Sequence, residues 1–151
     1  YSIFLVLLVT VQTYFPFLPL KGKLDITNRY HVFSSFPNEL QNYLATESKY
    51  KNYRIVANNY QIPSMVNLYI KPELEATCLS IGYHKTLYSF LYPDENLAGG
   101  NYLYLTTGKN FPDNLKRYFD ETIFLNQFKS IRRGEVIAKY SLWHVINYHG
   151  K

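Results

Sequence analysis

The sequence predicts an α/β fold: a three-layer sandwich with a mainly parallel sheet and a C-terminal antiparallel hairpin, preceded by an apolar, transmembrane-like helix. The first observation is that helix-like and strand-like segments alternate through the middle of the chain, which is typical of a sheet with helices on its faces. The second is that residues 122–131 and 135–148 read as two strands on either side of Arg132-Arg133-Gly134, where Gly favours the positive φ of a hairpin turn.

The first twenty residues set the expected domain organisation. Residues 1–20 are predominantly apolar and carry no charged side chain before Lys21. A charge-free apolar stretch of about 18 to 20 residues is long enough to cross a bilayer core as a helix. We therefore expect residues 1–20 to be the last transmembrane helix of a membrane protein, or its remnant, and residues 21–151 to be a soluble α/β domain. A buried core helix that ends at Pro16 is the alternative.

The expected elements then follow in order. Leu40, Tyr43 and Leu44 lie at helical spacing, which predicts an amphipathic helix that ends near residue 49. The prolines and glycines mark the breaks between the later elements. The elements expected after this helix are a strand over 53–58, a helix over 61–70, a strand over 76–81, an ambiguous segment over 86–92, a loop over 93–100, a strand over 101–106 and a helix over 112–119.

Charge and composition exclude several classes of function. The chain has 16 Lys and Arg residues against 11 Asp and Glu residues, a net charge of +5. Its basic residues are scattered, and the only adjacent ones are Lys116-Arg117 and Arg132-Arg133, whereas nucleic-acid-binding proteins usually cluster theirs on one face. We therefore expect no nucleic-acid partner. A weakly basic domain held at a membrane is instead attracted to anionic head groups or to a lipid phosphate.

No catalytic or metal-binding pattern is visible. The four histidines are too dispersed for a ligand motif, and the single cysteine, Cys78, lies in an apolar strand-like segment. There is no Gly-x-Ser-x-Gly motif and no Gly-rich phosphate-binding loop. We expect no catalytic residue, no metal ligand and no cofactor within this chain.

Polar segments at the ends of predicted strands form the first candidate site. In open parallel sheets, ligands bind outside the carboxyl ends of the strands. The sequence predicts three such strand ends, each followed by polar residues, at 58–61, 82–85 and 107–110. Polar loops of this kind also occur in any soluble domain without binding anything. The side chains that we expect at this binding edge are Asn59, Tyr60, Gln61, His84 and Lys109.

The segment that follows the apolar run forms the second candidate site. If residues 1–20 lie in the membrane, Asp25, Thr27 and Arg29 lie just outside it. Arg29 could bind a phosphate through two parallel hydrogen bonds. Asp25 could orient Arg29 across a tight turn, with Thr27 bonding the backbone. The alternative is a local turn that only joins the apolar segment to the domain.

An apolar segment that ends in Leu18-Pro19 is followed by Asp25, Thr27 and Arg29 and then by Ala57-Asn58-Asn59-Tyr60-Gln61. This succession of motifs resembles the C-terminal region of bacterial membrane glycosyltransferases akin to the dolichyl-phosphate-mannose protein mannosyltransferases. The likeness extends over nearly the whole chain through short motifs. Two departures are Ile26, where the family commonly has Pro, and a stretch after Gly82 that is poor in Gln and Trp. The matching residues are Leu18-Pro19, Asp25, Thr27, Arg29, Ala57-Asn58-Asn59-Tyr60-Gln61, Leu68-Tyr69 and Tyr102-Leu103-Tyr104-Leu105, followed in order by Phe119 and Arg133-Gly134.

This resemblance implies an enzyme of the inner membrane that transfers a sugar from a polyprenyl-phosphate carrier to a protein or glycolipid acceptor. It implies that the present domain lies on the periplasmic side, covers the acceptor side of the active site and is itself non-catalytic. The resemblance is also compatible with a divalent metal in the full-length protein. The matching positions Asp25 and Arg29 would lie closest to the lipid phosphate. The competing hypothesis is a membrane-anchored binding module, with one span, for a glycan, a peptide or a protein partner.

Overall fold

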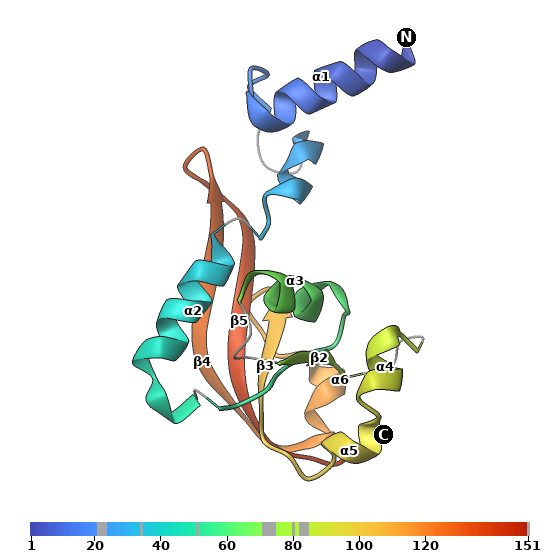
Figure 1. Cartoon of the computed structure of the whole chain (residues 1–151). Coiled ribbons are helices and arrows are strands. Elements are labelled where there is room, and N and C mark those ends of the chain that lie inside the picture. The colour runs from blue at the N-terminus through green and yellow to red at the C-terminus, as the bar shows by residue number, and fades with distance from the viewer. Residues whose placement is uncertain are drawn as a thin grey trace.

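The chain folds around a five-stranded sheet with the strand order β2-β1-β3-β5-β4 (Figure 1). The computed structural model describes residues 1–20, 24–33, 35–50, 52–70, 75–79, 81 and 85–150. The strands are β1 (Ile55–Ala57), β2 (Ala76–Cys78), β3 (Tyr102–Thr107), β4 (Phe119–Arg132) and β5 (Glu135–Tyr148).

The sheet is mixed. Strand β1 pairs in parallel with β2 and with β3, whereas β5 pairs in antiparallel fashion with β3 and with β4. The predicted α/β class is therefore confirmed, but the sheet is not mainly parallel. The reason is the hairpin: β4 and β5 have 14 residues each, whereas β1 and β2 have three residues each.

The helices agree with the predicted order, with two corrections. The predicted loop over 93–100 contains a short helix, and the helix predicted over 112–119 ends at Lys116. Phe119 instead begins β4, because its ring is buried and it pairs with Tyr148 across the hairpin. The helices are α1 (Ser2–Tyr14), η2 (Ile26–Tyr30), α2 (Phe36–Thr46), η3 (Ser48–Tyr50), α3 (Gln61–Tyr69), α4 (Leu87–Leu91), α5 (Asp94–Leu97) and α6 (Asp113–Lys116).

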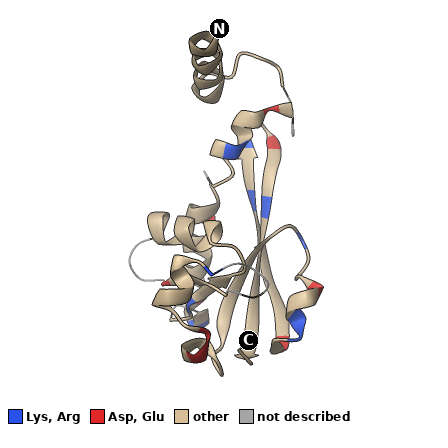
Figure 2. Ribbon diagram, turned by 90° about the vertical axis from the view of Figure 1, so that its right-hand side faces the viewer, with Lys and Arg blue, Asp and Glu red and all other residues tan. Residues whose placement is uncertain are grey.

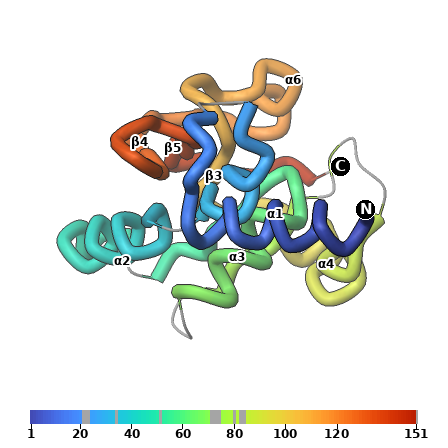
Figure 3. The backbone as a smooth tube through the Cα atoms, turned by 90° about the horizontal axis from the view of Figure 1, so that it is seen from above, coloured from blue at the N-terminus to red at the C-terminus, as the bar shows by residue number. Residues whose placement is uncertain are grey.

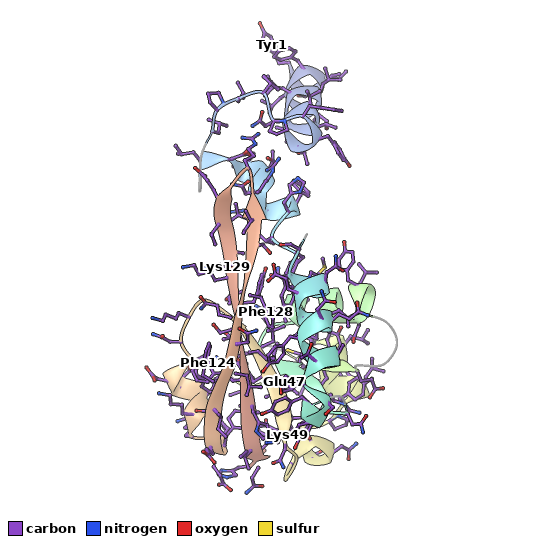
Figure 4. All side chains as sticks on the ribbon, turned by 90° about the vertical axis from the view of Figure 1, so that its left-hand side faces the viewer. Tyr1, Glu47, Lys49, Phe124, Phe128 and Lys129 are labelled. Atoms are coloured by element: carbon purple, nitrogen blue, oxygen red, sulfur yellow. The ribbon has the colours of Figure 1, made fainter. Side chains whose placement is uncertain are left out.

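Alternating strand residues divide the apolar interior into two clusters on opposite faces of the sheet. Leu103 belongs to the first cluster, in which it packs with side chains from α2 and α3. Its neighbour Tyr104 belongs to the second cluster, with side chains from α5 and α6. Successive side chains of a strand point to opposite faces, so β1, β3, β4 and β5 each contribute to both clusters. Figure 4 labels Phe128 of β4, whose ring contacts Phe36 and Tyr43 of α2.

The β4–β5 hairpin extends beyond the rest of the sheet. Its turn has two central residues, Arg133 with φ 52° and Gly134 with φ 76°, and two positive φ values are what a tight type I′ hairpin requires. Strand β3 pairs with β5 only from Tyr140 to Val145. The remaining length of the hairpin projects toward the N-terminal segment (Figure 1). We call the hairpin tip, residues 24–33 and α1 the neck, and the rest of the chain the body.

Helix α1 lies apart from the body and presents apolar side chains on every side. It has 13 residues, so the helix is shorter than the apolar segment over 1–20 that the sequence suggests. Figure 2 shows no charged residue on this helix. Ile3, Phe4 and Leu7 are each more than half exposed. Within the described ranges, no helix is both long enough and apolar enough to span a membrane.

Candidate functional site

A groove beside η2 brings together residues from both of the predicted sites. The cavity has a volume of about 670 Å³ and lies between the η2 segment and the start of α3. Arg29 lines it from η2, and Tyr60 and Gln61 line it from the N-terminal turn of α3, together with Ser64. We call this cavity the Arg29 groove. Seen from above in Figure 3, α1 passes over the α3 side of the body.

Arg29 is the cationic group of this groove. It is exposed, and within the described part of the chain no hydrogen bond or ion pair engages its guanidinium. Because the guanidinium carries five N–H donors in a planar fork, it matches the geometry of a phosphate or a carboxylate. Tyr30, Tyr60 and Met65 supply apolar and aromatic surface beside it. The groove can therefore accept an anionic group that is attached to an apolar body.

Asp25 and Thr27 are not part of this groove. Both side chains are buried, and Asp25 accepts hydrogen bonds from the backbone N–H of Thr27 at 3.0 Å and from its hydroxyl at 2.5 Å. A third hydrogen bond to the carboxylate comes from the side-chain amide of Gln12 at 3.4 Å. Thus Asp25 begins η2 and connects it to α1, and the predicted orientation of Arg29 by Asp25 is not what the structure shows.

The ionic partners of Asp25 are the two arginines at the hairpin tip. Nitrogen atoms of Arg132 and Arg133 lie 3.6 Å and 3.7 Å from one Asp25 carboxylate oxygen. Arg132 also donates to the hydroxyl of Thr27 at 2.7 Å and to the backbone carbonyl of Thr13 at 2.9 Å. In the sequence these arginines mark a turn, and Arg133 is also one of the positions that match the family. Their adjacency and this match are the signals that could have drawn attention to them.

This cluster, which we call the neck clamp, also controls the ionisation of Asp25. Burial alone would raise the pKa of the Asp25 carboxyl. The hydrogen bonds from Thr27 and Gln12 and the charge of Arg132 outweigh burial and hold that pKa below its ordinary value. The carboxylate is therefore ionised at neutral pH, and the clamp joins α1, η2 and the hairpin tip by charge-assisted hydrogen bonds.

A second cavity lies at the carboxyl ends of β1 and β3, where the sequence placed a binding edge. Its volume is about 280 Å³, and we call it the strand-end pocket. Asn59 lines it after β1, Thr106 and Thr107 line it from β3, and Asn114 lines it from α6. Asn59 also accepts the backbone N–H of Ile62 at 3.2 Å, which stabilises the first turn of α3.

Of the two remaining candidates, the structure describes only Lys109. Lys109 is exposed and does not line either of them, while its backbone carbonyl accepts a hydrogen bond from Ser141 at 3.3 Å. His84 lies outside the described residues. The predicted set of five is therefore divided, with Asn59 in the strand-end pocket and with Tyr60 and Gln61 in the Arg29 groove.

A third cavity, of about 370 Å³, lies between α3 and α4 and shares Tyr60 and Ser64 with the Arg29 groove. Leu87, Tyr88 and Leu91 of α4 line it. We call it the α4 groove. Since the two grooves share walls, they follow each other along the exposed side of α3.

The side chains of His144 and Cys78 are buried in the interior of the body. The ring of His144 packs against those of Tyr50 and Tyr53, at centroid distances of 5.4 Å and 5.2 Å. Burial lowers the pKa of His144. Burial also raises the pKa of the Cys78 thiol to about 11. Among the described residues, no three His, Cys, Asp or Glu side chains are placed to hold a metal ion together.

Comparisons of the chain with protein-family models, with curated proteins and with solved structures gave no match.

Proposed function

We propose that this chain is the membrane-facing domain of an integral-membrane glycosyltransferase of the inner membrane, and that the domain binds the phosphate of a polyprenyl-phosphate sugar donor. In this proposal the domain lies on the periplasmic side, covers the acceptor side of the active site and contributes no catalytic residue. The acceptor is a protein or a glycolipid.

The observation that carries the proposal is the placement of Arg29. An exposed guanidinium without a partner among the described residues lines an apolar and aromatic groove. The segment that contains it packs against α1, whose apolar side chains are exposed all round. A polyprenyl phosphate has the matching chemistry, since an anionic phosphate is attached directly to a long apolar chain. Aromatic side chains beside the cation suit the boundary between head groups and hydrocarbon.

The neck clamp supports the same proposal. It fixes the end of α1 to the hairpin tip through the hydrogen bonds that Arg132 donates to the carbonyls of Gln12 and Thr13. It fixes the start of η2 to the same tip through the ion pairs of Asp25 with Arg132 and Arg133. If α1 enters the hydrocarbon region, the clamp holds η2, and with it Arg29, at the membrane surface. Coulombic attraction to a phosphate is strongest there because the surroundings exclude water from one side.

The test is binding of the whole chain to phosphatidylcholine vesicles with and without undecaprenyl phosphate, measured by flotation. We expect undecaprenyl phosphate to strengthen binding, and Arg29→Ala to reduce that increment about tenfold or more, because a charge-assisted hydrogen-bonded pair contributes about 1.5–3 kcal/mol. The matched control is Arg117→Ala, which removes an exposed arginine of the body that contacts Tyr118.

Two results would overturn the proposal. One is equal binding to vesicles with and without undecaprenyl phosphate. The other is an equal loss of binding for Arg29→Ala and Arg117→Ala, which would show that only total charge matters. Inorganic phosphate as a competitor separates recognition of the phosphate from general adsorption to the vesicle.

The α4 groove favours a second candidate function, a membrane-anchored module that binds a glycan, a peptide or a protein. Tyr60 and Tyr88 offer aromatic surface there, and Asn67 offers an amide that also bonds Ala76. This module would bind its partner without undecaprenyl phosphate. Retained partner binding by Arg29→Ala, together with loss on Leu91→Asp, would favour the module over the transferase domain.

A further inference from the structure

We infer that the strand-end pocket is a binding site for a single neutral sugar ring. The inference goes beyond the proposed function, because it concerns a different cavity and a different ligand chemistry from those of the Arg29 groove. Either can fail without the other.

The topology of the sheet places this pocket at a switch point. After β1 the chain passes through α3, on the face of the first apolar cluster, to reach β2. After β2 it returns past α5, on the face of the second cluster, to reach β3 on the other side of β1. From the carboxyl end of β3 the chain continues through α6, whose Leu115 also lies in the second cluster, so the chain leaves the carboxyl ends of β1 and β3 on opposite faces of the sheet. Open α/β sheets bind ligands in the crevice that such a reversal creates.

The lining of the pocket selects a neutral, polyhydroxylated ligand. None of the described residues that line it is charged, and its polar groups are the amides of three asparagines and the hydroxyls of two threonines and one tyrosine. Amides and hydroxyls can both donate and accept, which is what a ring of sugar hydroxyls requires. A phosphate or a carboxylate would meet no cation among these side chains.

Several of these polar groups remain available to a ligand. The amide NH₂ of Asn59 and the side chains of Thr107 and Asn114 form no hydrogen bond with the described residues. Asn58, by contrast, is already used: with its amide nitrogen facing β2, it lies 2.9 Å from the carbonyl of Ile81 and 3.1 Å from that of Leu79. The free donors and acceptors come from three separate elements, so they surround the cavity rather than line one wall.

The volume and the apolar surface of the strand-end pocket are suited to a single sugar ring. The volume of about 280 Å³ lies near the lower end of small-molecule pockets, which begin at about 300 Å³. Ile62 and Pro112 add apolar surface for the C–H faces of a pyranose. An oligosaccharide could place only one of its residues in this cavity.

The experiment is a ¹⁵N chemical-shift titration of the whole chain in a zwitterionic detergent without a sugar head group. The probes are methyl glucopyranoside, methyl mannopyranoside and methyl galactopyranoside, with glucuronate as the charged comparison. We expect at least one neutral glycoside to shift the amide signals of Asn59, Thr107 and Asn114 in a saturable way. Glucuronate should bind more weakly.

Two variants of the pocket and one control variant test whether the glycoside binds in the strand-end pocket. Asn59→Asp keeps the acceptor that begins α3 but replaces the free NH₂ by an oxygen. Thr107→Val removes a hydroxyl at nearly constant volume. Each should weaken binding about three- to tenfold, which corresponds to the loss of a neutral hydrogen bond. The matched control Asn42→Asp, on the exposed side of α2, should bind like the wild type. The same spectra report whether each variant is folded.

The absence of saturable shifts with all three glycosides would overturn the inference. So would shifts that map to the Arg29 groove or the α4 groove, or binding that Asn59→Asp and Thr107→Val leave unchanged.

Discussion

The body and the neck of this molecule are stabilised in different ways. The body buries two apolar clusters on the faces of its sheet, with side chains such as Phe36, Leu103 and Leu115 fully covered. The neck has little apolar burial beyond Phe33, whose ring stacks on Tyr140. Most of its other described contacts are polar: the Val32 carbonyl accepts hydrogen bonds from Ser130 and Tyr140, and the clamp forms around Asp25. The free energy gained by burying apolar surface does not depend on direction, whereas hydrogen bonds depend on distance and angle. The few bonds of the clamp therefore fix the orientation of α1 and η2 relative to the hairpin tip.

This difference shows how α1 can be held at a defined position without being part of the core. Loss of the clamp should free α1 and η2 while the sheet stays folded, because units with few buried apolar contacts open locally at low cost.

The largest effect is expected in the body. Phe36 is fully buried and stacks on Tyr140 at a centroid distance of 4.4 Å. Phe36→Ala should lower the free energy of unfolding by about 3–5 kcal/mol through lost burial and the cavity it leaves. Urea denaturation followed by circular dichroism measures this. The control Leu87→Ala, at an exposed position of α4, should change it by less than about 0.5 kcal/mol. Equal effects of the two substitutions would contradict the account of the core.

A smaller and local effect is expected in the neck. Asp25→Asn removes the charge that faces Arg132 and Arg133 and should lower the free energy of opening of residues 24–33 by about 2–3 kcal/mol. Hydrogen exchange should show faster exchange in η2 and unchanged protection in β3 and β5. The matched control is Glu75→Gln in the exposed pair with Arg54, worth about 0–1 kcal/mol. Faster exchange throughout the sheet would show that the neck and the body unfold together.

The smallest effect is a pH dependence of the body. The pKa of His144 is lowered in the folded chain, because burial, together with the nearby Lys49, disfavours the protonated ring. The neutral ring stabilises the fold above the ordinary histidine pKa of 6.5, and this contribution is lost as the pH falls from there through the folded-state value. Wild-type stability should therefore decrease over this range more than that of His144→Phe. Parallel pH profiles of the two proteins would exclude His144 as the cause.

The body was largely predictable from local sequence. The helix around Leu40 and Leu44, the strands ending near Asn58 and Thr106, and the turn at Gly134 all follow from apolar periodicity and turn chemistry. The short helix after Pro93 was not predicted, because four helical residues give too little periodicity to recognise. The direction of β5 beside β3 makes the sheet mixed, and strand order is not encoded in any short pattern.

The neck was not predictable in the same way. Arg132 and Thr27 are separated by 105 residues, so their hydrogen bond has no local signature. Asp25, Thr27 and Arg29 were expected to act together, yet the hairpin tip draws the first two into the clamp and leaves Arg29 in the groove. The meeting of Arg29 with Tyr60 and Gln61 likewise depends on where the hairpin holds η2.

The central claim is that α1 and the neck face a membrane, and depth measurement with a spin label tests it most directly. The label is placed by Leu7→Cys on α1 or by Leu87→Cys on α4, two leucines that are both largely exposed, while Cys78 is buried and stays unlabelled. With vesicles of phosphatidylcholine and phosphatidylglycerol, we predict that the label at residue 7 becomes accessible to oxygen and protected from a water-soluble nickel complex, whereas the label at residue 87 stays in water. Equal exposure of both labels to the nickel complex would contradict the claim.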